Sequence, residues 1–179
     1  MDSSSQEGEK KKKITEVKTF PVPFASGEIK QNLTININTP SQPSKEQIIN
    51  EAFKFHSQGN ISEAAKLYQY FISQGFNDHR VFSNYGTILK ELGKLKEAEL
   101  STRKAIELNP DFAMAHSNLG NLLKELGKLQ DAELSQRKAI ELKADYAEAH
   151  SNLGTILRDL GNLKEAEIST RKAIQIKPD

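Results

Sequence analysis

Residues 113–146, AMAHSNLGNLLKELGKLQDAELSQRKAIELKADY, form a 34-residue unit that the chain repeats. The repeat is visible as identical residues that recur every 34 positions, in a glycine series and an asparagine series. The glycines are Gly59, Gly93, Gly127 and Gly161, and the asparagines are Asn50, Asn84, Asn118 and Asn152. Self-similarity at a period of 20 to 50 residues indicates a solenoid, in which stacked units share one core.

Each unit is predicted to contain two helices. Leu119, Leu122 and Leu126 fall at helical spacing, which gives the first helix an apolar stripe. Gly127 is expected to end this helix, because helices often end at a left-handed residue and glycine adopts that conformation cheaply. A second helix is expected from about residue 130 to residue 142. One such hairpin cannot bury its own apolar faces, so neighbouring units must stack into an all-α solenoid.

The first unit departs from the others because it is rich in aromatic residues. Phe53, Tyr68 and Phe71 are among six aromatic side chains that the later units lack. Terminal units of a solenoid are commonly atypical because they cap the stack. We expect these rings to pack in the core; the alternative is that they line a ligand pocket.

The segment that precedes the units has a different character. Residues 1–13 are polar and end in a run of lysines, which predicts a solvated tail. Apolar residues alternate with polar ones over residues 29–37, which is the period of a half-buried strand. We therefore predict a short β-hairpin or an extended lead within residues 14–38, followed by a Pro/Ser linker up to residue 44. A hairpin alone is marginal in water.

Composition narrows the function classes. The chain has 25 basic and 24 acidic residues, so its net charge of +1 supplies no strong field for nucleic acid or an anionic membrane. It has no cysteine, which excludes disulfides and thiolate metal sites. No apolar run reaches about 18 residues, and the start of the chain lacks the apolar core of a signal peptide. We expect a cytoplasmic protein with no cofactor.

The order N-L-G followed by G, A, A and P resembles the tetratricopeptide repeat (TPR) over residues 45–179. The stretch HSNLGNLLKELGKLQDAE is most similar to the TPR arrays of O-linked N-acetylglucosamine transferases. The opening KTFPVPFASGEIKQNLTININTPS is similar to the N-terminus of TPR proteins from marine picocyanobacteria. The resemblance implies a right-handed α-solenoid of four TPR units whose first helices line a concave face. These units are expected at residues 45–78, 79–112, 113–146 and 147–179.

No catalytic constellation emerges from the sequence. His116 and His150 each precede a serine, but they recur once per unit, whereas an active site is normally built once. A metal site needs several ligands that converge within about 2 Å of one ion. Six residues separate Gly120 from Gly127, where a phosphate-binding loop has four between its glycines. The sequence predicts that this chain is not an enzyme.

The resemblance places the binding surface on the exposed positions of the first helices. These positions are Arg80, Ser83, Asn84, Thr87, Lys90 and Glu91 in the second unit; Met114, Ser117, Asn118, Asn121, Lys124 and Glu125 in the third; and Glu148, Ser151, Asn152, Thr155, Arg158 and Asp159 in the fourth. Serine stands at 83, 117 and 151, where TPR domains that clamp a C-terminal carboxylate would need a lysine. We therefore do not expect that subtype.

The recurrent asparagine needs an explanation, because asparagine in the middle of a helix is a mediocre helix former. One interpretation is a local hydrogen bond between the two helices of each hairpin. The other is a ladder whose amides bind the C=O and N–H groups of an extended peptide backbone. The predicted peptide-binding residues are Asn50, Asn84, Asn118, Asn152, Asn121, Lys90, Lys124 and Arg158.

Two functions remain open at this point. The first is a non-enzymatic scaffold that binds a peptide or a partner protein along the concave face. The alternative is the targeting arm of a glycosyltransferase or sulfotransferase whose catalytic domain is not in this chain. A separate expectation concerns the last helix, where Ile168, Ile174 and Ile176 are predicted to be exposed. That edge predicts weak self-association or a continuation of the chain.

Overall fold

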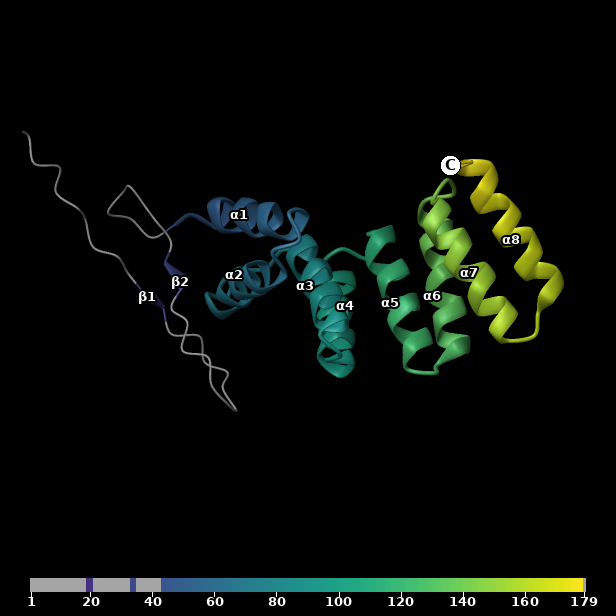
Figure 1. Cartoon of the computed structure of the whole chain (residues 1–179), viewed down its shortest axis with the longest axis horizontal. Coiled ribbons are helices and arrows are strands. Elements are labelled where there is room, and N and C mark those ends of the chain that lie inside the picture. The colour runs from purple at the N-terminus through teal and green to yellow at the C-terminus, as the bar shows by residue number, and fades with distance from the viewer. Residues whose placement is uncertain (1–18, 21–32, 35–42, 179) are drawn as a thin grey trace, which may run out of the picture.

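The computed structural model describes residues 19–20, 33–34 and 43–178. Residues 43–178 form eight helices that stack as four successive hairpins along one axis (Figure 1). The helices are α1 (Lys45–Ser57), α2 (Ile61–Ser73), α3 (His79–Glu91), α4 (Leu95–Leu108), α5 (Ala113–Glu125), α6 (Leu129–Leu142), α7 (Ala147–Asp159) and α8 (Leu163–Ile176). The prediction of an all-α solenoid built from helix pairs is confirmed.

A capping box marks the start of the array. Ser44 Oγ accepts a hydrogen bond from the backbone N–H of Gln47 at 3.2 Å, and the backbone N–H of Ser44 donates to Gln47 Oε1 at 2.8 Å. Two backbone donors that no helical carbonyl can reach are thereby satisfied. Helix α1 therefore begins at Lys45, where the serine-containing linker was predicted to end.

The turn inside a hairpin depends on the recurrent glycine. Gly127 has φ 73°, a left-handed conformation that a side chain would strain. The backbone N–H of Lys128 then donates to the carbonyl of Leu123 at 2.8 Å, which closes the end of α5. This local bond reverses the chain so that α6 returns along α5.

Small residues let the two helices of a hairpin approach closely. A Cβ added at Gly120 on α5 would lie 2.6 Å from Gln136 Nε2 on α6, which is far below an ordinary contact. Ala132 and Ala139 of α6 are fully buried between their neighbours. Larger residues at these positions would separate the helices, so the small-residue pattern of the unit sets its thickness.

The aromatic residues of the first unit pack in the core. Tyr68 and Phe71 are fully buried, and the rings of Phe53 and Tyr68 meet edge to face with their centroids 6.1 Å apart. Burial raises the pKa of Tyr68 to about 12, although a hydrogen bond with Asn84 acts in the opposite direction. Within the residues described, these side chains form a packed cluster, which agrees with the core interpretation.

From the second unit on, the first helices of successive units lie closer to one another than the second helices do. Helix α5 contacts both α3 and α7, whereas the second helices α4, α6 and α8 make no comparable contacts among themselves in residues 43–178. A stack in which one layer is more tightly spaced must curve toward that layer. The first helices therefore line the concave side, as the resemblance implied.

Two short strands pair ahead of the array. Strand β1 (Thr19–Phe20) runs antiparallel to β2 (Leu33–Thr34), with Thr19 opposite Thr34 and Phe20 opposite Leu33. The rest of the predicted hairpin and the lysine-containing tail at residues 1–13 lie outside the described residues. Among the helices that the structure describes, none combines the length and apolarity needed to cross a membrane.

Candidate functional site

The inner face is the surface formed by the first helices, α1, α3, α5 and α7. Two of its predicted positions are wrong. Ser83 and Ser117 were expected to be exposed, but they are 0% and 2% exposed, respectively. The direct contact of α5 with α3 and of α7 with α5 covers both serines. Ser151, which no described helix covers, is exposed.

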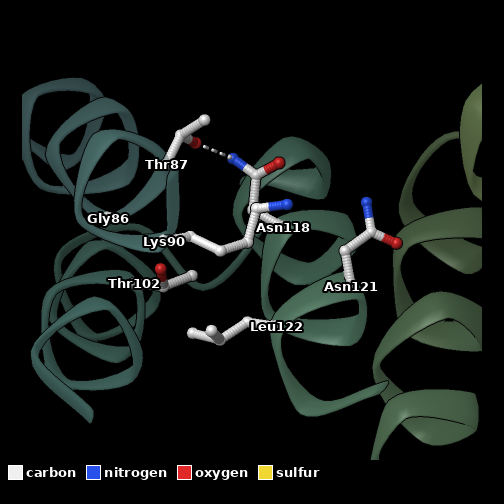
Figure 2. A pocket seen from close by; sticks show the side chains of 7 residues that line it. All are labelled: Gly86, Thr87, Lys90, Thr102, Asn118, Asn121 and Leu122. Atoms are coloured by element: carbon white, nitrogen blue, oxygen red, sulfur yellow. Dashed lines mark hydrogen bonds between the residues drawn. The ribbon is translucent and has the colours of Figure 1, made fainter. Parts of the chain in front are cut away.

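Asn118 connects two units on the inner face. Its Nδ2 donates to Ser83 Oγ at 3.1 Å. The same nitrogen lies 3.4 Å from Thr87 Oγ1, the contact that Figure 2 draws as a dashed line. Thr87 in turn donates from Oγ1 to the carbonyl of Ser83 at 3.3 Å. The asparagine therefore joins the first helices of successive units, and not the two helices of one hairpin as the structural interpretation had it.

The other three asparagines of the series lie in different environments. Asn50 on α1 is exposed, and Asn84 on α3 is hydrogen-bonded to the hydroxyl of Tyr68. Asn152 on α7 is half-buried and makes no side-chain hydrogen bond within residues 43–178. The same sequence position thus has four different sets of neighbours.

Gln136 on α6 is a site residue that sequence reasoning missed. Its Nε2 donates to the carbonyl of Ser117 at 2.9 Å and to Asn121 Oδ1 at 3.0 Å. Its Oε1 is buried with no partner among the described residues. The sequence contained a signal for this residue, because the third unit has glutamine where the second and fourth units have Thr102 and Thr170.

These bonds fix the orientation of two amides that line a common pocket. The pocket lies between α3 and α5 and has a volume of about 140 Å³. Because Asn118 donates to Ser83 and Asn121 accepts from Gln136, Asn118 Oδ1 and Asn121 Nδ2 are left without partners in the part of the chain described. Figure 2 shows both amides on the same side of α5. The pocket is lined by Gly86, Thr87, Lys90, Thr102, Asn118, Asn121 and Leu122.

The predicted cations of the inner face take part in ion pairs between units. Lys90 Nζ lies 3.0 Å from Glu125 Oε1, and Lys124 Nζ lies 3.5 Å from Asp159 Oδ2. Arg158 has only a 3.7 Å contact with its neighbour Asp159, and its side chain is 65% exposed. The inner face therefore carries paired charges, with one largely free guanidinium at its C-terminal end.

The outer face carries a more buried ion pair. Glu99 accepts hydrogen bonds from Arg103 NH2 at 2.8 Å and from Lys128 Nζ of the next unit at 3.0 Å. These two bonds, with Arg103 contributing more, lower the pKa of Glu99, and its side chain is 16% exposed. Glu99 thus forms a helix-stabilising pair with Arg103, four residues on, and also links α4 to the next unit through Lys128.

The recurrent histidines contact backbone carbonyl groups. His116 Nε2 lies 2.8 Å from the carbonyl oxygen of Pro110, and His150 Nε2 lies 3.0 Å from that of Ala144. Each contact ties a first helix to the turn that precedes it. Within the described residues, no three His, Cys, Asp or Glu side chains group closely enough to hold a metal ion.

Three family models match the chain, and all three describe the same repeat. The family model "TPR repeat" matches residues 86–127, and two models described as "Tetratricopeptide repeat" match residues 115–146 and 147–179. Together they span residues 86–179 without a gap. No curated protein sequence matches the chain.

Solved structures share the fold at low sequence identity. MamA is 19% identical, with a TM-score of 0.68, and the match covers 75% of this chain and 78% of that one. YrrB, described as a TPR protein with an unusual peptide-binding site, is 24% identical, with a TM-score of 0.66 and coverage of 76% and 70%. The first TPR of Spaghetti (RPAP3), solved with the HSP90 peptide SRMEEVD, is 24% identical, with a TM-score of 0.61 and coverage of 65% and 93%.

Proposed function

We propose that this chain, which belongs to the tetratricopeptide-repeat family, is a scaffold that binds an extended peptide segment of a partner protein on its inner face. The observation that carries the proposal is the pair of partnerless amide atoms, Asn118 Oδ1 and Asn121 Nδ2, at the pocket between α3 and α5. One is an acceptor and the other is a donor. They match the N–H and C=O groups of a peptide backbone, which are otherwise costly to desolvate.

The environment of the amides favours a peptide over a small molecule. The pocket volume of about 140 Å³ is smaller than the roughly 300–1,000 Å³ of a typical small-molecule site. Asn84 and Asn152 occupy the equivalent positions on α3 and α7, so a peptide that runs along the face meets an amide in each unit. Backbone recognition of this kind tolerates many side chains.

The charged side chains of the inner face would give a limited preference for acidic residues in the peptide. Lys90 and Lys124 are held in exposed ion pairs, which are worth about 0–1 kcal/mol each and exchange partners readily. A peptide carboxylate beside either lysine would compete with the internal acid, so the gain would be small. Arg158 is the cation with the most exposed side chain among these three, and it favours an acidic residue near that end of the peptide.

The peptide-binding site of YrrB and the HSP90 peptide bound to the RPAP3 domain support the proposal by family likeness only. Here serine stands where a carboxylate clamp would need lysine, and Ser83 and Ser117 are buried. We therefore propose internal segments, and not C-terminal carboxylates, as ligands. No observation in the described part of the chain favours the alternative of a glycosyltransferase or sulfotransferase arm.

Backbone N-methylation tests the proposal directly. A binding peptide selected from a random library is resynthesised with one N-methyl group at each position in turn, and its affinity is measured by isothermal titration calorimetry. Loss of the N–H that donates to Asn118 Oδ1 should weaken binding roughly 2- to 12-fold at that position. Asn118→Ala, which removes the acceptor, should abolish that sensitivity, whereas Lys96→Ala on α4 should not.

Two results would contradict the proposal. Binding that is insensitive to N-methylation but sensitive to single side-chain changes would show that the inner-face amides do not bind backbone. Selection of no peptide by the folded array would exclude an extended ligand on this face.

A further inference from the structure

The terminal groove is the surface between α7 and α8 that no described helix covers. It is lined by Ser151, Gly154, Thr155, Arg158, Leu163, Ala166, Glu167, Thr170 and Arg171, and has a volume of about 400 Å³. The groove lies at the C-terminal end of the stack, where Figure 1 shows α8 as the last helix. Its residues have close counterparts inside the array, which allows its occupant to be inferred.

The second unit presents nearly the same groove, and there α5 covers it and leaves only the pocket of about 140 Å³. The counterparts lie 68 positions earlier and are Ser83, Gly86, Thr87, Lys90, Leu95, Ala98, Glu99, Thr102 and Arg103. Eight of the nine residues are identical, and the ninth exchanges Arg158 for Lys90. Helix α5 packs on this groove, so its contacts show which side chains the terminal groove fits.

Helix α5 binds its groove through five side chains at regular spacing. Leu122 packs with Leu89 and Ala98, and with the half-buried Leu95. Leu119 packs with Ile106 at the end of α4. Asn118 bonds to Ser83, Glu125 pairs with Lys90, and Lys128, just beyond the helix, pairs with Glu99. The recognition pattern is Asn-Leu-x-x-Leu-x-x-Glu-x-x-Lys.

At the terminal groove the same contact residues are exposed. Leu163 and Ile174 are 65% and 60% exposed, whereas their internal counterparts Leu95 and Ile106 are half-buried. The Glu167 side chain is 62% exposed, against 16% for Glu99. This end of the array therefore offers both apolar and charged side chains to a ligand.

Ile168 is exposed, as predicted, but the cause is not the lack of a following unit. Leu100 and Leu134 at the same position of the second and third units are 70% and 66% exposed, against 68% for Ile168. The position faces outward in these three units, whether or not a helix follows. Leu163, which was not predicted, belongs to the groove instead.

We propose that the terminal groove binds an amphipathic helix of a partner protein that carries the pattern Asn-Leu-x-x-Leu/Ile-x-x-Glu/Asp-x-x-Lys. The two leucines cover Leu163 and Ile174, the asparagine donates to Ser151 and Thr155, and the acid pairs with Arg158. The final lysine pairs with Glu167. Helix-in-groove recognition through anchors at i, i+3 and i+4 spacing is a recurrent mode of peptide binding.

A second copy of this chain fits the groove poorly. Its free first helix is α1, which has Glu51 and Lys54 in place of the two leucines and Ser57 in place of the acid. Only Asn50 matches. Burial of Glu51 and Lys54 against Leu163 and Ile174 would desolvate charges without partners, which is strongly unfavourable. The groove therefore favours a partner helix over head-to-tail stacking of copies.

The probe is a peptide that copies residues 113–130 of this chain. A hydrocarbon staple joins positions 120 and 124, which contact α6 and α7 in the protein and leave the groove-facing side intact. Binding of the fluorescein-labelled peptide to the full chain is followed by anisotropy. The matched control is a stapled peptide that copies residues 45–62. We expect saturable binding of the first peptide only.

Two variants test the contacts. Ile174→Glu, at an exposed position, should weaken binding at least about tenfold because it places a charge against Leu119. Arg158→Glu should weaken binding about fivefold, and a peptide with Glu125→Lys should recover most of that loss. Recovery by the swapped pair distinguishes a specific groove from general adhesion.

Three results would overturn the proposal: equal binding of the control peptide, no effect of Ile174→Glu, or no recovery in the charge swap. Light scattering provides a further check. A dimer that Ile174→Glu separates, but that excess peptide does not, would show that a second copy occupies the groove and that the partner-helix proposal is wrong. Arg158 also lies on the inner face, so Ile174→Glu, which changes a residue outside that face, is the variant that distinguishes this proposal from peptide binding there.

Discussion

Asn118 Nδ2 on α5 lies 3.1 Å from Ser83 Oγ on α3, and the two residues are 35 positions apart in the chain. The serine is fully buried, so this amide is the partner that satisfies its hydroxyl. A side chain that looks like part of a ligand-binding ladder in the sequence thus also holds neighbouring units together.

We predict that Asn118→Ala lowers the free energy of unfolding by about 1–2 kcal/mol, because it leaves a buried hydroxyl without its donor. Urea unfolding followed by circular dichroism measures the change. Asn152→Ala is the matched control, since Asn152 makes no such bond within residues 43–178, and its effect should stay within about 0.5 kcal/mol. Equal losses in both variants would mean that the bond to Ser83 contributes little.

A methyl group at Gly120 should separate α5 from α6. Gly120→Ala places a Cβ 2.6 Å from Gln136 Nε2, and Gln136 is held by two hydrogen bonds and cannot easily move. Overpacking costs about 1–3 kcal/mol, while alanine gains up to about 1 kcal/mol in helix propensity. We expect a net loss of stability in thermal melts.

A second-site change tests the cause of that loss. In the Gly120→Ala/Gln136→Ala double variant, the added methyl group no longer meets the amide. The double variant should therefore be more stable than the sum of the two single changes predicts. Simple additivity would show that the steric contact is not responsible.

The ion pair of Glu99 predicts a pH dependence. Its pKa is lowered in the folded state by Arg103 and then Lys128, so the charged form stabilises the fold. That contribution is present above the ordinary pKa of about 4.3 and is lost as the pH falls through the lower folded value. Glu99→Gln should reduce the melting temperature at pH 7, by an amount equivalent to a few tenths of a kcal/mol to about 1 kcal/mol.

The same comparison at low pH serves as the control. At a pH below the lowered folded pKa of Glu99, the gap between Glu99→Gln and the original protein should shrink, because both then carry a neutral side chain. Glu97→Gln, at an exposed acid two residues away, should leave the melting temperature nearly unchanged at both pH values. A gap that is constant with pH would contradict the assignment.

The capping box at Ser44 predicts that the array folds without the preceding segment. Removal of residues 1–42 leaves Ser44 and Gln47 in place, so helical circular dichroism and cooperative melting should be retained. A further Ser44→Ala change should cost about 1 kcal/mol through loss of the cap. Collapse of the helical signal in the truncated protein would place the earlier residues in the core.

Most of the helical array could be predicted because its determinants are local. The 34-residue period, the glycine that ends each first helix and the leucine spacing placed two helices in each of four units, and the structure has these eight helices from Lys45 to Ile176. The aromatic residues of the first unit were also predicted correctly as core. Each of these features depends on neighbours within one turn or one hairpin.

The site was only partly predictable, for a physical reason. The asparagine series was visible in the sequence, but the surroundings of each member were not. Whether Asn118 meets Ser83, or Asn121 meets Gln136, depends on how α5 sits against α3 and α6. The burial of Ser83 and the outward direction of Ile168 have the same origin.

The sequence by itself thus determined the order and the approximate bounds of the helices, because helical periodicity acts over a few residues. The layer that each helix occupies followed from the family resemblance. Only the tertiary structure decided which polar groups remain free. Hydrogen bonds between residues about 34 positions apart require a defined rotation between stacked units. That rotation comes from the packing of Leu119 and Leu122 on the preceding unit. It leaves two amide atoms of α5 available on the inner face and the groove of α7 and α8 uncovered.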